Sequence, residues 1–448
     1  MQNSLKERIN LLDSEIHKIA LPNILANISI PLLGIVDTAL MGRLDDPAYI
    51  GAIAVGGVIF NILYWGLGFL RPGTTGLTAQ AYGQQDTIEC YRLFWRSSLV
   101  GLALGLFILI FHKPLGEACF SLLSASTQVE ELAYQYFSIR VLAAPAVISL
   151  FAMRGWFFGM QDAITPMILT IVTNVTNIII SWHLVINMDM GVIGVATGTM
   201  VAQWITFGLA LIILAYKHRT MILRYFDRSI LQVKELSRFA RVNRDMFIRN
   251  IGLIMVFSFF TDYSSQVNDD YLAINQMLLQ LFYFTSYAVD GFAYASESLV
   301  GKYLGANKLD TVFKVIRKCL VYGLGFGILF AILYLLFGKH LLSLMTTNMD
   351  LIDLALPYLM WLALVSITGA LAFIWDGVYS GGTASKELRD SMCISVIIFF
   401  AIHFSLKSSY PTHAIWAAMV GFMVCRSLFQ WLLFKSRIRP EWQRVEGK

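Results

Sequence analysis

The first half of the sequence reappears in the second half after a shift of 222 residues. Residues 77–83 (LTAQAYG) fall on residues 299–305 (LVGKYLG), and Gly159 falls on Gly381. Each copy is an almost continuous series of apolar runs. A duplicated apolar series is typical of a membrane transporter built from two similar halves, which handle the transported species between or inside them.

Composition indicates that the solvent of this chain is lipid. Hydrophobic residues make up 57% of its 448 residues and charged residues only 14%, too few to cover a water-soluble protein of this size. A helix rises about 1.5 Å per residue, so about 20 apolar residues cross a bilayer core of about 30 Å. The sequence contains twelve such runs, near residues 19–42, 48–70, 97–111, 127–150, 163–186, 190–215, 245–261, 271–295, 319–337, 353–375, 391–406 and 412–434. We expect an all-α integral membrane protein with twelve transmembrane helices in two six-helix repeats.

The distribution of charge predicts the orientation. Residues 217–249 carry nine lysines and arginines against three acidic residues, whereas alternate connections such as residues 45–46 and 269–270 are acidic. Positively charged loops stay on the cytoplasmic side, so both termini and the central linker are predicted inside. The expected organisation is an N-lobe over residues 1–215 (spans 1–6), a cytoplasmic linker over residues 216–244, and a C-lobe over residues 245–448. The net charge of +5 is no sign of a nucleic-acid partner.

Motifs for metal, nucleotide or covalent chemistry are missing from the sequence. The five cysteines form no CxxC pair, and the seven histidines form no HExxH motif. The sequence has no Walker A lysine motif and no GxGxxG after a strand. These observations predict no metal site, no cofactor and no enzymatic activity, and they argue against transport driven by ATP within this chain.

Polar residues inside the spans are expensive, so each is a candidate functional residue. Asp37 is the only charge between Lys18 and Arg43, and it lies about 28 Å along the helix from Lys18. On span 5, the side chains at i, i+3 and i+7 share one helical face and reach the depth of that carboxyl: they are Asn174, Asn177 and Ser181. Desolvation favours the neutral form of such a carboxyl, so it can exchange a proton. A structural hydrogen bond between spans 1 and 5 is the alternative.

In the second half, the candidate polar site of the C-lobe comprises Asp290, Asp376 and Glu297. Asp290 and Asp376 lie toward the cytoplasmic side of spans 8 and 10, and for Glu297 a solvated role at the cytoplasmic surface is the favoured interpretation. A role in transport and a structural ion pair are equally good readings of the two aspartates. The candidate partners are Arg140, Arg154 and Arg426. Arg140 lies well inside span 4, and we expect it to make a structural pairing.

Two prolines precede the acid of span 1. Pro22 and Pro31 each remove a backbone hydrogen bond and can bend a helix. We therefore expect span 1 to bend near Asp37.

Several motifs, in order and correctly spaced, resemble the multidrug and toxic compound extrusion (MATE) family, in particular its bacterial DinF-like branch. They are residues 31–44 (PLLGIVDTALMGRL), 70–83 (LRPGTTGLTAQAYG), 155–167 (GWFFGMQDAITPM), 174–181 (NVTNIIIS), 290–305 (DGFAYASESLVGKYLG) and 375–382 (WDGVYSGG). The resemblance implies two six-helix lobes around a cleft, and cation-coupled export of amphiphilic, often cationic, drugs across the bacterial inner membrane by a monomer. The family's cation-coupling acid of span 1 matches Asp37, and the asparagine of its polar cluster on span 5 matches Asn177. The acid of span 10 that some other branches use matches Asp376. Many relatives have a second aspartate where this chain has Ser181.

The identity of the coupling ion follows from this difference. Sodium prefers several oxygen ligands including carboxylate, and Ser181 removes the second acid of the N-lobe. We therefore expect a proton, with sodium as the alternative if Asp376 and nearby carbonyls form a site. A lipid-linked sugar flippase of the same superfamily is the other alternative. It should line its cleft with basic residues, and only Arg140 is a clear candidate in mid-span.

Topology gives a direct test. Cysteines introduced as Asp45→Cys and Lys234→Cys should react with a membrane-impermeant thiol reagent from opposite sides, because the charge bias places the first outside and the second inside. Labelling of both positions from the same side of intact cells would overturn the twelve-span topology.

Overall fold

The computed structural model describes residues 2–41, 48–121 and 126–446, apart from the side chains of some helical residues, Asp37 among them. The described residues form helices joined by short turns and contain no strand. Helices satisfy every internal backbone donor and acceptor within one segment, which a bilayer requires because it supplies no hydrogen bonds. The expected all-α fold is confirmed.

The chain divides into two compact units. The unit called N-terminal here comprises residues 25–82 and 86–240, and the C-terminal unit comprises residues 1–24, 83–85 and 241–448. Helix α1 (Gln2–Met41) therefore gives its first half to the C-terminal unit and its second half to the N-terminal unit. The lobe and linker boundaries expected from the sequence stay a prediction.

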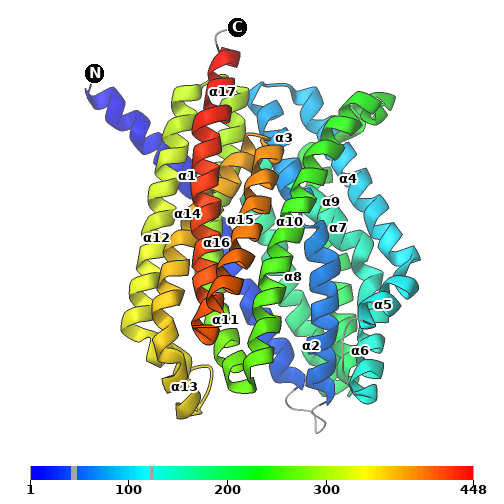
Figure 1. Cartoon of the computed structure of the whole chain (residues 1–448). Coiled ribbons are helices and arrows are strands. Elements are labelled where there is room, and N and C mark those ends of the chain that lie inside the picture. The colour runs from blue at the N-terminus through cyan, green and yellow to red at the C-terminus, as the bar shows by residue number, and fades with distance from the viewer. Residues whose placement is uncertain (1, 42–47, 122–125, 447–448) are drawn as a thin grey trace. The chain divides into compact units, whose positions relative to one another are not determined.

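The N-terminal unit contains the second half of α1 and eight further helices among the described residues. They are α2 (Ala48–Phe60), α3 (Leu70–Gly83), α4 (Thr87–Ile110), α5 (His112–Phe120), α6 (Thr127–Arg140), α7 (Ala144–Gly159), α8 (Ile164–Trp182) and α9 (Gly191–Arg224). Short π or 3₁₀ segments are η1 (Asn61–Trp65), η2 (Val141–Ala143), η3 (His183–Asn187) and η4 (Arg228–Leu231). Within this unit the main helix pairs are α4 with α7, α8 with α9, and α2 with α6 (Figure 1).

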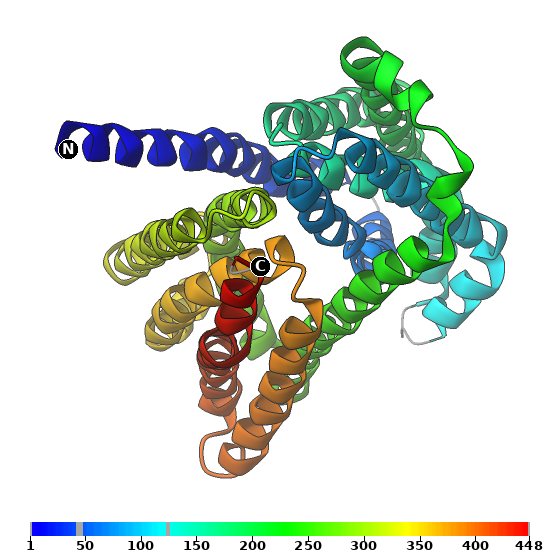
Figure 2. The ribbon, with the colours of Figure 1, turned by 90° about the horizontal axis from the view of Figure 1, so that it is seen from above.

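The C-terminal unit follows the same plan. Its helices are α10 (Val233–Val267) from residue 241 onward, α11 (Asp269–Gly305), α12 (Leu309–Ser343), α13 (Met349–Ala355), α14 (Leu359–Gly381), α15 (Ser385–Leu406), α16 (Pro411–Leu433) and α17 (Arg439–Glu446), with η5 (Leu356–Tyr358) and η6 (Phe434–Ile438). Helix α14 packs on α11, α12 and α16, and α15 packs on α16. Figure 2 shows α12, α14, α15 and α16 of this unit grouped together, in yellow-green through orange to red.

The structure repeats its helix ends at the same spacing as the sequence. Gln85 and Asn307 both have positive φ angles, 60° and 53°, just before α4 and α12 begin. Gln161 and Thr383 also have positive φ angles, 66° and 54°, just before α8 and α15 begin. A left-handed residue of this kind ends a helix, so each repeat terminates and restarts its helices at equivalent positions.

Glycines let equivalent helices approach closely in both units. A Cβ atom at Gly155 would collide with the backbone carbonyl of Arg71, and one at Gly377 would collide with that of Ala293. Both members of each pair are related by the 222-residue shift. Small residues allow helices to pack backbone against backbone in a membrane, where apolar side chains gain little from leaving lipid.

Ten described helical segments are long and apolar enough to cross a membrane. They coincide with ten of the twelve expected runs. The other two runs lie in α1 and α11, which are not among the ten but are helices of 40 and 37 residues. The chain is thus a multi-pass helical protein.

One glycine contact can be tested with a matched neighbour. A Cβ atom at Gly327 in α12 would lie 2.8 Å from the Cβ of Ala370 and 2.9 Å from the carbonyl oxygen of Ser366, whereas one at Gly325 meets nothing within 4 Å. Gly327→Ala should lower the free energy of unfolding by about 1–3 kcal/mol, because α12 and α14 must separate. Gly325→Ala should leave the free energy of unfolding unchanged or slightly higher. Thermal unfolding of both variants in detergent measures the difference, and equal melting temperatures would contradict the proposed contact.

Candidate functional site

Helix α8, which carries the polar stripe of the N-terminal unit, is fixed at its start by Asp162. The carboxylate of Asp162 accepts hydrogen bonds from the backbone N–H of Thr165 at 3.0 Å and from its hydroxyl at 2.6 Å. Lys217 forms an ion pair with the same carboxylate at 3.0 Å. Burial raises the pKa of Asp162, but the Thr165 hydrogen bonds and the Lys217 ammonium outweigh it and leave that pKa below its usual value. The charged carboxylate thus holds the first turn of α8.

Two hydrogen bonds connect the stripe to neighbouring helices. The side-chain amide of Asn174 donates to the hydroxyl of Ser29 on α1 at 2.6 Å. The amide of Asn177 donates to Thr199 on α9 at 2.8 Å, and that hydroxyl in turn donates to the carbonyl of Val195. The structural tie between α1 and α8 is therefore made by Asn174 with Ser29.

Two oxygen atoms of the stripe are left over. The side-chain oxygen of Asn177 and the hydroxyl of Ser181 have no hydrogen-bond partner among the described residues, although the side chains are only 1% and 0% exposed. An unsatisfied buried polar group costs about 1–3 kcal/mol, so native proteins rarely keep one without a reason. Together the two atoms can receive a proton donor or a small cation.

Asp37 lies in helix α1, and its side chain is outside the described residues. Its backbone is eight residues beyond Ser29, a rise of about 12 Å. Ser181 is seven residues beyond Asn174, a rise of about 10 Å. Ser29 and Asn174 are hydrogen-bonded, so the backbones of residues 37 and 181 lie at similar distances along their helices from that bond.

In the C-terminal unit Asp376 lies at the centre of a buried ionic cluster. Its Oδ2 atom accepts from Arg426 of α16 at 2.6 Å and from Arg249 of α10, and its Oδ1 atom accepts from Gln430 of α16 at 2.6 Å. Arg426 is completely buried, and Asp290 of α11 also acts on it electrostatically. The structure thus pairs Asp376 with Arg426, one of the partners expected from the sequence.

Glu297 corrects one expectation. The sequence predicts a solvated residue at the surface, but the side chain is only 2% exposed, so that prediction is wrong. The reason is the close approach of α14 to α11. A Cβ atom at Gly381 would collide with the backbone carbonyl of Glu297, so α14 covers this part of α11.

Arg140 of α6 is held by aromatic groups. It donates a hydrogen bond of 2.6 Å to the hydroxyl of Tyr136, and its guanidinium lies 4.5 Å from the ring centre of Phe60. A cation over an aromatic face is stabilised by the charge distribution of the ring. No carboxylate pairs with Arg140 in the described part of the chain.

Sequence reasoning missed several of these partners. Arg249 belongs to the run of basic residues at 217–249, and nothing in the sequence around Ser29, Thr199 or Gln430 marks them as partners. The spacing of Arg426 and Gln430 at i and i+4 on one helical face is a signal that could have identified their common partner. The two proline positions lie in a continuous helix α1, and the bend expected there stays a prediction.

Comparison with known proteins now identifies the family. The MatE family model matches residues 22–183 and 246–408, once in each half of the chain. The chain belongs to the MatE family. The double match agrees with the internal repeat, and the resemblance to the DinF-like branch of MATE proteins is confirmed. Proteins of this family are transporters and not enzymes.

Individual MatE relatives cover almost the whole chain. The DNA damage-inducible protein F of Escherichia coli (strain K12) is 34% identical over 420 residues, which are 93% of this chain and 90% of the relative. The probable multidrug resistance protein NorM of Thermotoga maritima is 23% identical over 96% of this chain and 94% of its own. A crystal structure of MATE in the bent conformation matches with a TM-score of 0.87 at 15% identity, over 98% of this chain and 97% of that one. The fold is therefore the MATE fold.

The ionic cluster around Asp376 should stabilise the C-terminal unit. Asp376→Asn removes the charge that compensates Arg249 and Arg426, and it should lower the free energy of unfolding by about 3 kcal/mol or more. Asp353→Asn is the control, because Asp353 pairs with Lys339 where both side chains are more than half exposed, and such pairs contribute at most about 1 kcal/mol. Thermal unfolding in detergent compares the two variants. Equal, small effects would show that Asp376 is not a structural anchor.

Proposed function

We propose that this chain is a proton-coupled multidrug efflux antiporter of the bacterial inner membrane, which exports amphiphilic and often cationic compounds. We further propose a monomer with twelve spans, both termini in the cytoplasm, and Asp37 as the residue that binds the coupling proton. The observation that carries the proposal is the pair of oxygens on α8, at Asn177 and Ser181, that have no hydrogen-bond partner in the described part of the chain.

The internal repeat supports a shared role for Asp37 and these two oxygens. Under the 222-residue shift, Asp37 falls on Phe259, while Asn177 and Ser181 fall on Phe399 and His403. In the C-terminal unit the ring of Phe259 lies 6.0 Å from that of Phe399 and 5.1 Å from that of His403. Equivalent helices in a repeat fold make equivalent contacts, and this equivalence supports our proposal that Asp37 acts together with Asn177 and Ser181.

A protonated carboxyl fits this arrangement. Burial disfavours a charged carboxylate and favours the neutral acid, which can donate a hydrogen bond to an amide or hydroxyl oxygen. When the proton leaves, the charged form attracts a cationic drug. Proton and drug then compete, and each lowers the affinity of the other by the same factor.

The prolines of α1 provide a means of movement. Side chains already bond to carbonyls near them: Asn23 donates to Ile19 at 2.7 Å, and Ser29 donates to Ala26 at 2.6 Å. Side-chain bonds of this kind accompany bent helices. We propose that protonation of Asp37 lets α1 bend at Pro22 and Pro31 and expel the bound drug.

Sodium is the less favoured coupling ion. Asp376, the acid that might hold it in the C-terminal unit, already accepts from two guanidinium groups and an amide. A sodium ion would have to displace both positive groups. In the N-terminal unit, Ser181 offers a single neutral oxygen where a second acid would strengthen a metal site.

The test is dye efflux from proteoliposomes under imposed gradients. Asp37→Asn keeps the size and hydrogen bonding of the side chain but removes its titration, and it should abolish proton-driven efflux. Asn177→Ala should weaken efflux more mildly, because it removes a partner and leaves the carboxyl. Asp353→Asn, an exposed acid, serves as the control and should transport normally.

Two results of this assay would contradict the proposal. Transport at the normal rate in Asp37→Asn would show that another group couples transport. Efflux driven by a sodium gradient at clamped pH, and lost in Asp376→Asn but kept in Asp37→Asn, would replace the proton with sodium. Loss of efflux in Asp376→Asn together with loss of folded protein would leave the proton assignment intact.

A further inference from the structure

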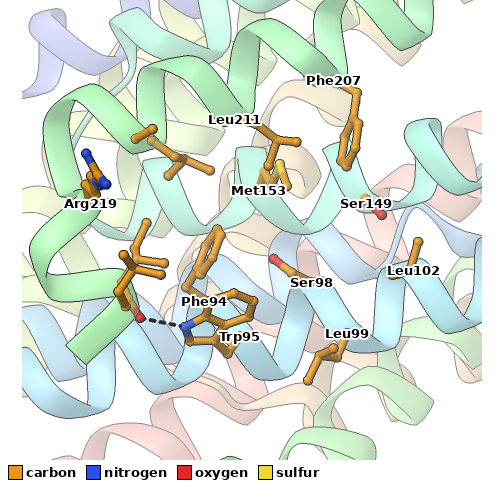
Figure 3. Close-up of a pocket in the computed structure, with 14 residues that line it drawn as sticks. Phe94, Trp95, Ser98, Leu99, Leu102, Ser149, Met153, Phe207, Leu211 and Arg219 are labelled. Carbon is orange, nitrogen blue, oxygen red and sulfur yellow. Dashed lines mark hydrogen bonds between the residues drawn. The ribbon is translucent and has the colours of Figure 1, made fainter. Parts of the chain in front are cut away.

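A cavity lies in the N-terminal unit between α4, α7 and α9, apart from the stripe on α8. It measures about 420 Å³, within the range of small-molecule pockets in proteins. Its wall is almost entirely apolar and is formed by residues such as Phe94, Leu102, Met153, Phe207 and Leu211 (Figure 3). An apolar cavity holds water poorly, so an apolar ligand is its natural occupant.

Lipid has direct access to this cavity. Leu99 and Leu102 of α4 and Leu211 and Leu223 of α9 line it, and each exposes more than a third of its surface. Exposed leucines on helices that cross a membrane face hydrocarbon. The lining residues of α9 extend from Phe207 to Leu223, a rise of about 24 Å, so the wall on this helix is elongated along the membrane normal.

One end of the cavity is basic. Arg219 lies there, at the end opposite Leu102 (Figure 3). It is exposed, and no ion pair or aromatic contact engages it among the described residues. Other nearby cations have partners: Lys217 pairs with Asp162, Arg92 pairs with Asp227, and the guanidinium of Arg224 lies 5.8 Å from the ring of Tyr225.

The cavity wall also carries polar groups that can donate hydrogen bonds to the ester carbonyls of a lipid. Trp95 lines the same end and donates from its indole nitrogen to the carbonyl of Ile222 at 2.9 Å, the dashed bond in Figure 3. Tryptophan is enriched where a membrane meets water. One turn deeper, the buried hydroxyl of Ser98 has no hydrogen-bond partner in the described part of the chain, and neither does that of Ser149 on α7. Serine in a helix normally donates to a carbonyl one turn back, so these two hydroxyls are free for a ligand.

We propose that this cavity binds one anionic glycerophospholipid from the surrounding bilayer. An acyl chain fills the apolar part, the phosphate pairs with Arg219, and an ester carbonyl accepts from Ser98. A cationic drug is excluded as the preferred occupant, because the unpaired charge at the mouth is positive. An acyl chain gains little by leaving one apolar medium for another, so the choice among lipids depends on the charged head.

Native mass spectrometry of the purified protein tests this, with phosphatidylglycerol and phosphatidylcholine of the same acyl chains. We expect one phosphatidylglycerol to be retained about five- to tenfold more tightly than phosphatidylcholine, as one charge-assisted contact predicts. Arg219→Ala should abolish the preference. Arg224→Ala removes an equal charge from the same helix end without lining the cavity, and it should leave the preference unchanged.

The apolar part is tested by filling it. Ser98→Leu should weaken retention of both lipids, and Leu102→Trp provides a second filling variant if the first does not yield folded protein. Equal loss of preference in Arg219→Ala and Arg224→Ala would reduce the effect to general surface charge and overturn the proposal. Retention unchanged in folded Ser98→Leu or Leu102→Trp would also overturn it. None of these measurements depends on transport, so they stand apart from the test of Asp37.

Discussion

Inside a bilayer a polar side chain finds no water, so its hydrogen bonds must come from the protein. The arrangement of both units follows from how they meet this demand. In the N-terminal unit, Asn174 joins α8 to Ser29 of α1 with one hydrogen bond. In the C-terminal unit, Asp376 joins α14 to α10 and α16 through two arginines and a glutamine. These polar links fix which helices neighbour one another, while glycine contacts set how closely they pack.

The two repeats share a backbone plan but not a chemistry. Left-handed turns before α4 and α12, and before α8 and α15, occur at equivalent positions. The polar stripe of α8, however, is replaced on α15 by Phe399 and His403, whose rings pack on Phe259. Conversely, Asp376 has Arg154 as its counterpart. The two repeats therefore share their helix packing. Their buried polar and charged residues differ: the N-terminal unit has the polar stripe on α8, and the C-terminal unit has the ionic cluster around Asp376.

The sequence predicted the elements that depend on local patterns. Apolar runs predicted the helices, and the i, i+3, i+7 spacing of Asn174, Asn177 and Ser181 predicted a common buried face. Features that depend on packing between distant helices escaped it. Arg249 belongs to a run of basic residues, so only its contact with Asp376 separates it from solvated neighbours. The sequence predicts Glu297 in solvent at the cytoplasmic surface, but α14 buries it. The cavity beside Arg219 draws its wall from three helices, and no local pattern marks it.

The difference between the two centres bears on which of them can work as a carrier. Both oxygens of Asp376 accept from donors, two of them charged, and removing this carboxylate leaves the buried Arg426 uncompensated. A centre of that kind resists change and holds helices together. Among the described residues, Asn177 and Ser181 each keep one oxygen without a partner, at a cost of about 1–3 kcal/mol apiece. A donor that reaches these oxygens removes that cost, so under the proposed function the pair stabilises the state in which the proton is bound. A site that binds and releases a proton in turn is incomplete in one of its states, and under the proposed function the two oxygens on α8 are the open positions.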